Sequence, residues 1–205
     1  MSVGFPDFRL GSVLATSFTG TLSERHGEAV ERIPTPHRLV DWLQINGLNV
    51  ESCTAAQLER ARELREAIHA VAAAAAVGSD LPKSTVRIIN DCSIEGRAAA
   101  ILMPDGNRLW RLSSPSRVED ALGVIAADAI SIIAGERDGR LALCASPTCQ
   151  AAFFDTSQSR TRRWCDMNTC GNRQKKARLK AAQSRSVETS TQWTCAMIKA
   201  HRGTR

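Results

Sequence analysis

The sequence predicts an α+β fold, with a helix-rich N-terminal domain that contains a β-hairpin, followed by a small module of a β-hairpin and a helix. Amphipathic patterns of helical period fill most of the first 134 residues. A turn sequence, PDGN, separates two short strand-like segments in the middle of the chain. Five of the seven cysteines and a run of cations lie after residue 140. Only 4% of residues are aromatic and none is tyrosine, so we expect a core of Ala, Leu, Ile and Val.

Helix-start and helix-stop residues delimit the first elements. Residues 9–22 have a mixed apolar pattern that indicates a first helix. A second helix is expected to begin after Thr35, the candidate N-cap, with Pro36 at its first position and Gly47 at its end. The clearest periodic pattern runs from Thr54 to Val77, and the glycine that follows it marks a C-terminus.

The pattern then changes from helix to strand and back. Residues 84–92 indicate a shorter helix. Residues 97–103 and 108–112 flank the PDGN turn and predict a β-hairpin. Residues 115–134 return to a helical period, with apolar side chains on one face. Two further strand-like pieces, LALC and AAFF, come after the polar segment GERDGR.

Charge divides the chain at this polar segment. The net charge is +6, but residues 1–139 hold 14 Lys and Arg against 18 Asp and Glu, whereas residues 140–205 hold 13 against 3. Such asymmetry points to a module that binds a polyanion beside a neutral or acidic body. We therefore predict a body over residues 1–139, a basic module over 140–184, and a Ser- and Thr-rich disordered tail over 185–205.

The cysteine spacing predicts a structural metal site. Cys144 and Cys149 form one C-x4-C pair, Cys165 and Cys170 form a second, and fifteen residues separate the pairs. Folding a hairpin between two such pairs brings four thiolates together, which suits one tetrahedral Zn²⁺ ion. Four buried free thiols, or disulfides, are the alternative. The other cysteines, Cys53, Cys92 and Cys195, have no partner spacing.

Aromatic side chains near the cysteines can cover the metal site. Phe153 and Phe154 are expected on one side as a very small core, and Trp164 on the other. Asp155 is interpreted as a turn-capping residue that holds this hairpin, with pairing to an arginine as the alternative. In the body, Trp42 and Trp110 are expected in the core, although they could instead line a small-molecule pocket.

The segment FFDTSQSRTRRWCDMNTCGNR, with the preceding C-x4-C pair, closely resembles the CGNR zinc-finger family. The resemblance runs from about Leu141 to Lys180 and includes the motif Cys170-Gly171-Asn172-Arg173. The preceding body, with LVDWLQINGL, resembles the ABATE-type domain that accompanies this finger. The resemblance implies a bacterial transcription regulator with a DNA-binding finger.

The residues after Cys165 favour a basic helix that starts at the metal. Asn168 is the candidate N-cap of a helix reaching about Ala182, a geometry similar to a treble-clef finger. The cations between residues 160 and 185 face only one acid, and we predict that they bind phosphates of DNA: Arg160, Arg162, Arg163, Arg173, Lys175, Lys176, Arg178, Lys180 and Arg185. The alternative is a zinc-thiolate redox sensor or protein-interaction module whose basic helix recruits an acidic partner.

Sequence evidence for catalysis is missing. His26, His37, His69 and His201 are scattered, and most are expected at the surface. No phosphate-binding loop or nucleophile motif occurs, and four cysteine ligands would fill a zinc ion's coordination sphere. We expect a cytoplasmic protein that is not an enzyme and has no membrane span, and whose body senses a small molecule or forms a homodimer.

Overall fold

The computed structural model describes residues 4–11, 13–181 and 183, which form two compact units. The first unit comprises residues 1–165 and the second begins at Asp166. Within the described residues, no helix combines the length and the hydropathy that a membrane span requires. The predicted tail, with Arg185, Cys195 and His201, lies outside the described residues.

Two helices of the first unit begin and end where the sequence indicates. In α2 (Pro36–Ile45), the Thr35 side chain accepts a hydrogen bond from the Arg38 amide, and Gly47 follows with a positive φ of 75°. The long helix α3 (Ala55–Val77) has a capping box between Thr54 and Gln57 and a left-handed Gly78 at its end. These termini are set by local chemistry, which is why the sequence shows them.

Two predicted helices need corrected bounds, and one hairpin was not predicted. The first helix, α1 (Leu14–Thr19), is much shorter than residues 9–22, because Gly20 ends it and a strand pair follows. That pair, β1 (Leu22–Ser23) and β2 (Val30–Glu31), is a small hairpin that the sequence did not reveal. Helix α4 (Lys83–Glu95) is longer than expected at both ends.

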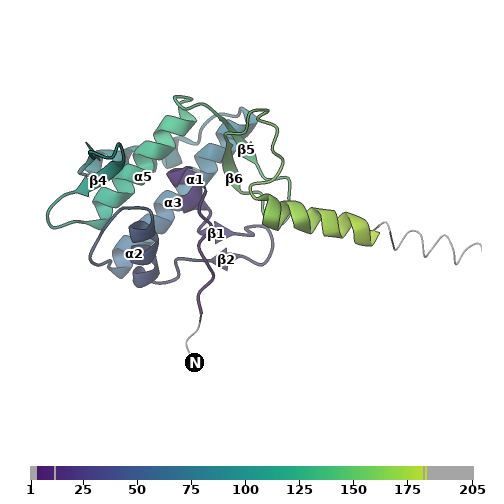
Figure 1. The fold of residues 1–205 in the computed structure, drawn as a ribbon, viewed down its shortest axis with the longest axis horizontal. Helices are drawn as coiled ribbons and strands as arrows, with labels where there is room; N and C mark the ends of the chain where they lie inside the picture. The colour runs from purple at the N-terminus through teal and green to yellow at the C-terminus, as the bar shows by residue number, and fades with distance from the viewer. Residues whose placement is uncertain (1–3, 12, 182, 184–205) are drawn as a thin grey trace, which may run out of the picture. The chain divides into compact units, whose positions relative to one another are not determined.

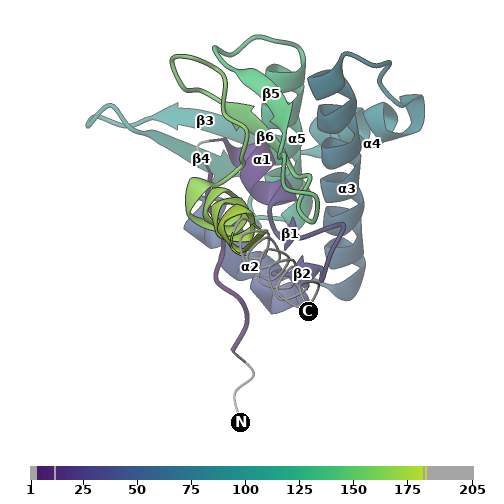
Figure 2. The ribbon, with the colours of Figure 1, turned by 90° about the vertical axis from the view of Figure 1, so that its right-hand side faces the viewer.

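The predicted central hairpin is confirmed, and a buried carboxylate fastens it. Strands β3 (Ala98–Leu102) and β4 (Arg108–Leu112) pair antiparallel around the PDGN turn, and Figure 2 shows this hairpin extending away from α3. The next helix, α5 (Val118–Ile133), begins three residues later than predicted. The fully buried Asp120 accepts hydrogen bonds from the amides of Arg97 and Ser113, so it ties the base of the hairpin to α5.

Where the end of α4 meets α5, the two backbones approach so closely that no side chain fits between Gly96 and Gly123. A Cβ added to Gly123 in α5 would lie 2.6 Å from the Cα of Gly96, and the reverse substitution gives the same distance. Glycine at both positions therefore allows backbone to pack against backbone.

The core joins the helices to the last hairpin. Helix α1 packs against α3, α5 and β6 (Figure 1). The Phe18 and Trp42 rings lie 5.1 Å apart within this core. Strands β5 (Arg140–Leu143) and β6 (Ala152–Asp155) pair antiparallel and contribute Leu141, Ala152 and Phe154 to the same core. The hairpin that carries the first cysteine pair is therefore part of the first unit's core.

Phe154 thus has a different role from the one expected. It does not belong to a separate small core over the metal site but packs within the main core, at 5% exposure. Gly139 makes room for it, since a Cβ there would lie 2.3 Å from the Phe154 ring.

Candidate metal centre

The four predicted ligands come together. The sulfur atoms of Cys144, Cys149, Cys165 and Cys170 all lie within 4.8 Å of one another, and those of Cys149 and Cys165 are 3.7 Å apart. A tetrahedral zinc ion with Zn–S bonds of about 2.3 Å would place its sulfurs about 3.8 Å apart. Three of the cysteines are at most 3% exposed, and Cys165 is half-buried.

The first pair is held by a tight turn between β5 and β6. The Cys144 amide donates to the Ala151 carbonyl at 2.9 Å, which closes the end of the hairpin. Inside this turn, the carbonyl of the fully buried Ser146 accepts the amides of both Cys149 and Gln150 at 3.1 Å. The turn therefore fixes the backbone on both sides of Cys149.

Backbone amides point at the sulfurs, as a set of thiolates requires. The amides of Cys165 and Ser146 donate to Cys144, and the Ala151 amide donates to Cys149. Hydrogen bonds from the Cys149 and Cys165 thiols, with these amides, lower the pKa of Cys144, whereas the same sulfur contacts raise the pKa of Cys165. Four sulfurs so close can all be ionised only if a cation lies among them, so the donor set fits Zn²⁺.

A buried aspartate organises the loop that leads to the second pair. The two carboxylate oxygens of Asp155 accept the amides of Ser157 and Arg162 at 3.0 and 2.9 Å. Burial raises the pKa of Asp155, but these hydrogen bonds lower it more, so the carboxyl stays ionised below its usual range. The loop returns to the first turn through the Ala145 amide, which donates to the Arg163 carbonyl. The turn-capping interpretation of Asp155 is confirmed.

The Asp155 carboxylate gives a first testable prediction. Asp155→Asn places an amide NH₂ against one of the two backbone N–H donors, so we expect the free energy of unfolding to fall by about 1–3 kcal/mol. Chemical denaturation of the zinc-loaded protein measures this change. Asp138→Asn is the matched control, because Asp138 has a side chain that is 90% exposed. Equal stability of the two variants would contradict the assigned role.

The second pair leads into a helix whose first turn is wide. Residues Met167–Gly171 form a π turn, and an α-helix continues over residues 172–181. The N-cap is Asp166 rather than the predicted Asn168: its side chain accepts the Asn168 amide, and its carbonyl accepts the amides of Cys170 and Gly171. A capping residue placed two positions earlier puts Cys170 inside a π turn instead of the first turn of an α-helix.

The structure places the predicted nucleic-acid-binding residues in two groups. Lys175, Lys176, Arg178 and Lys180 are exposed on the helix, and Arg173 is half-buried there. Three more precede Cys165: Arg160 pairs with Asp138, Arg162 lies 5.4 Å from the Phe153 ring centroid, and Arg163 lies 5.4 Å from that of Trp164. The three arginines of this second group therefore lie against an acid or an aromatic ring of the protein.

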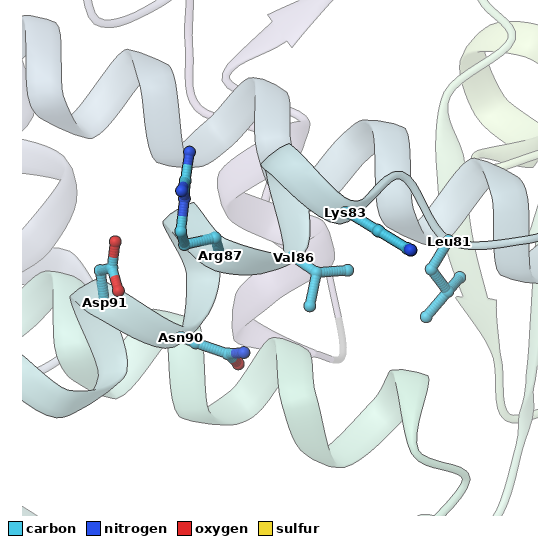
Figure 3. Close-up of a pocket in the computed structure, with 6 residues that line it drawn as sticks. All are labelled: Leu81, Lys83, Val86, Arg87, Asn90 and Asp91. Atoms are coloured by element: carbon cyan, nitrogen blue, oxygen red, sulfur yellow. The ribbon is translucent and has the colours of Figure 1, made fainter.

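Sites elsewhere in the described chain are weaker candidates. Trp42 is fully buried in the core. A hollow of about 520 Å³ lies instead along α4, where Figure 3 shows Arg87 and Asn90 pointing in different directions; its lining is Leu81, Lys83, Val86, Arg87, Asn90 and Asp91. His26 and His37 are exposed, but His69 is half-buried on α3, where burial and the nearby Arg25 lower its pKa to about 4.

Sequence reasoning missed several residues that shape the site. Asp166 directly follows Cys165. The general preference of aspartate for N-cap positions is a signal from which it could have been predicted. Ser146 and Thr148 lie between the first cysteine pair. Ser146 accepts amides from within the same turn, whereas the printed contacts of Thr148 reach Glu24 and His26, far away in the sequence. No local signal points to Glu24, whose contact with Thr148 spans 124 residues.

Comparison with known families agrees with this architecture. A model named ABATE, described as "Putative stress-induced transcription regulator", matches residues 12–136, and a model of the CGNR zinc finger matches residues 140–183. No curated protein is significantly similar to the chain. With four clustered cysteines inside the second match, the site is a CGNR zinc finger that fits one structural Zn²⁺. Because the first match covers more than half of the residues, the chain belongs to the ABATE family of transcription-regulator type, and a CGNR zinc finger follows the ABATE domain.

Proposed function

We propose that the chain is a zinc-dependent DNA-binding regulator whose basic helix contacts the phosphate backbone. The observation that carries this proposal is the run of exposed cations directly after the fourth zinc ligand, with no acid between Met167 and the end of the described helix. Membership of a family of transcription-regulator type supports it. In this proposal residues 1–139 act as a sensor or dimerisation domain and residues 140–184 bind DNA in the cytoplasm.

The spacing of the cations suits a continuous polyanion. Arg173, Lys176 and Lys180 follow one another at i, i+3 and i+7, which places them on one face of the helix. Lys175 and Arg178 occupy an adjoining strip. Like charges at these spacings repel one another, and a phosphate backbone would relieve that repulsion while releasing its counterions.

The redox-sensor alternative receives less support from the site. Oxidants attack exposed thiolates most readily. Cys144, Cys149 and Cys170 are at most 3% exposed, which protects most of the sulfur cluster.

A salt titration of duplex binding tests the proposal. Contacts with five to eight phosphates would give a log–log slope of affinity against salt of about −4 to −7. Lys176→Ala should weaken binding to every duplex alike and reduce the slope by about one. Lys83→Ala, which removes a cation from α4, is the matched control and should leave the slope unchanged. A slope near zero for the zinc-loaded protein would overturn the proposal.

A further inference from the structure

A turn of the N-terminal domain contacts the first zinc-binding turn directly. We call residues 24–27, between β1 and β2, the clamp turn, and residues 144–150 the zinc turn. The Thr148 hydroxyl donates to a carboxylate oxygen of Glu24 at 2.8 Å, and the His26 amide donates to the Thr148 carbonyl at 3.1 Å. The clamp turn therefore contacts both the hydroxyl and the carbonyl of Thr148.

The contact is close as well as polar. A Cβ added to Gly27 would lie 3.0 Å from the Cβ of Thr148 and 3.3 Å from its methyl carbon. The Gly27 amide also donates to the Glu24 carbonyl at 2.9 Å, which closes the clamp turn on itself. A methyl group at Gly27 would therefore require the Thr148 side chain to shift by a few tenths of an ångström.

Both turns hold a residue in a conformation that side chains disfavour. Glu24 has a φ of 55° and is 8% exposed, and Gln150, next to Cys149, has a φ of 45°. A left-handed non-glycine residue persists only where its surroundings impose it, because the backbone conformation costs free energy. The mutual contact between the turns provides such surroundings on both sides.

The clamp turn is itself anchored to the long helix. Arg25 forms an ion pair with Glu66 of α3 and donates to the Thr19 carbonyl at 3.1 Å, and its side chain is 9% exposed. The backbone of Gln150 in turn hydrogen-bonds His69, one helical turn further along α3. The zinc turn therefore contacts the N-terminal domain at two places, the clamp turn and helix α3.

We infer that Glu24 and Gly27 of the clamp turn are positioning residues for zinc, acting through Thr148 to keep Cys149 in ligand geometry and so to slow release of the ion. Thr148 directly precedes Cys149, and the Ser146 carbonyl ties that cysteine's amide to the rest of the turn. Outer partners that orient metal ligands commonly alter metal affinity by 10- to 100-fold. The inference concerns the ion alone and does not depend on whether the basic helix binds DNA.

Zinc release from the full chain to a chromogenic chelator, at a temperature where circular dichroism shows the protein folded, tests the inference. Thr148→Val keeps the size of the side chain but removes the hydroxyl, and it should release zinc about 10-fold faster. Thr148→Ser keeps the hydroxyl and should restore slow release. The same contrast is expected between Glu24→Ala, which removes the acceptor, and Glu24→Gln, which keeps one.

Two further variants separate a specific contact from general loosening. Glu28→Gln removes an exposed acid from the same hairpin and should release zinc at the native rate. If Glu24 and Thr148 act through each other, the double variant Glu24→Ala/Thr148→Val releases zinc no faster than either single variant. Multiplied effects in the double variant, or native release rates in Thr148→Val, would overturn the inference. Should Glu24→Ala fail to fold, the comparison of Thr148→Val with Thr148→Ser decides alone.

Discussion

Cys149→Ser is expected to reduce the zinc content from one ion per chain to almost none. A serine hydroxyl is not ionised at neutral pH, and at 1% exposure the site cannot recruit a substitute ligand from the solvent. Structural zinc supplies about 10–16 kcal/mol of apparent binding free energy, part of which stabilises the fold. If about a third of this binding free energy stabilises the fold, losing the ion should lower the midpoint of thermal unfolding by about 10 °C. Metal analysis and calorimetry on the same sample measure both changes.

The loss should be local rather than global. Leu141, Ala152 and Phe154 keep the β5–β6 hairpin in the core of the first unit, so we expect its helices to survive without zinc. Cys53→Ser is the control, because this thiol lies outside the cluster and its replacement should leave the zinc content at one. Full zinc occupancy in Cys149→Ser would refute the four-thiolate site.

Gly123→Ala is expected to destabilise the first unit by about 2 kcal/mol, although alanine normally favours a helix. In an exposed helix this substitution would stabilise by about 1 kcal/mol. Here the added methyl would lie 2.6 Å from the Cα of Gly96 and 3.2 Å from the Cys92 carbonyl oxygen. Both are backbone atoms, so relief requires α4 and α5 to move apart, and overpacking of this kind costs about 1–3 kcal/mol. Urea unfolding measures the difference.

The control for this substitution lies on the same helix. Ala127 is exposed on α5, and Ala127→Ser should change the free energy of unfolding by no more than about 0.5 kcal/mol. Gly96→Ala, which meets the Gly123 Cα from the opposite side, should reproduce the loss seen in Gly123→Ala. A Gly123→Ala protein as stable as the native one would show that the two helices are not locked at this distance.

Elements with local start and stop signals could be predicted from the sequence. Thr35 and Thr54 cap their helices through their own side chains, and Gly78 ends α3 in the left-handed conformation that glycine favours. The PDGN turn likewise contains its own hydrogen bond, from the Gly106 amide to the Met103 carbonyl. In each case the decisive contacts lie within a few residues of one another, so the sequence displays them directly.

Elements that depend on distant contacts could not be predicted. Strands β1 and β2 are only two residues long, too short for an alternating pattern, and Arg65 of α3 binds Glu31 of that hairpin with two hydrogen bonds of 2.8 Å. Phe154 belongs to the main core because Gly139 leaves space for its ring, and nothing in the segment AAFF shows that. Burial against remote residues is invisible to a local pattern.

The candidate site also contains features that local sequence predicts and features that depend on distant contacts. The cysteine spacing predicted which four side chains come together, and their cluster fits one structural Zn²⁺ ion. The assignment of the helix cap failed because Asp166 and Asn168 are both good capping residues, and only the backbone geometry shows which one accepts the amides. The contribution of the N-terminal domain to the zinc turn, through Glu24, is non-local and emerges only from the folded chain.

The π turn over Met167–Gly171 sets the rotational phase between the Cys170 sulfur and the cations of the described helix. A π turn holds about one residue more than an α turn, and each helical residue advances the side chain by about 100°. Gain or loss of a single residue just after Cys170 would therefore rotate the cations of this helix by a quarter-turn or more about the helix axis. The four sulfurs would keep their positions. The number of residues directly after Cys170, more than their identity, therefore determines the direction in which the basic side chains of this finger point.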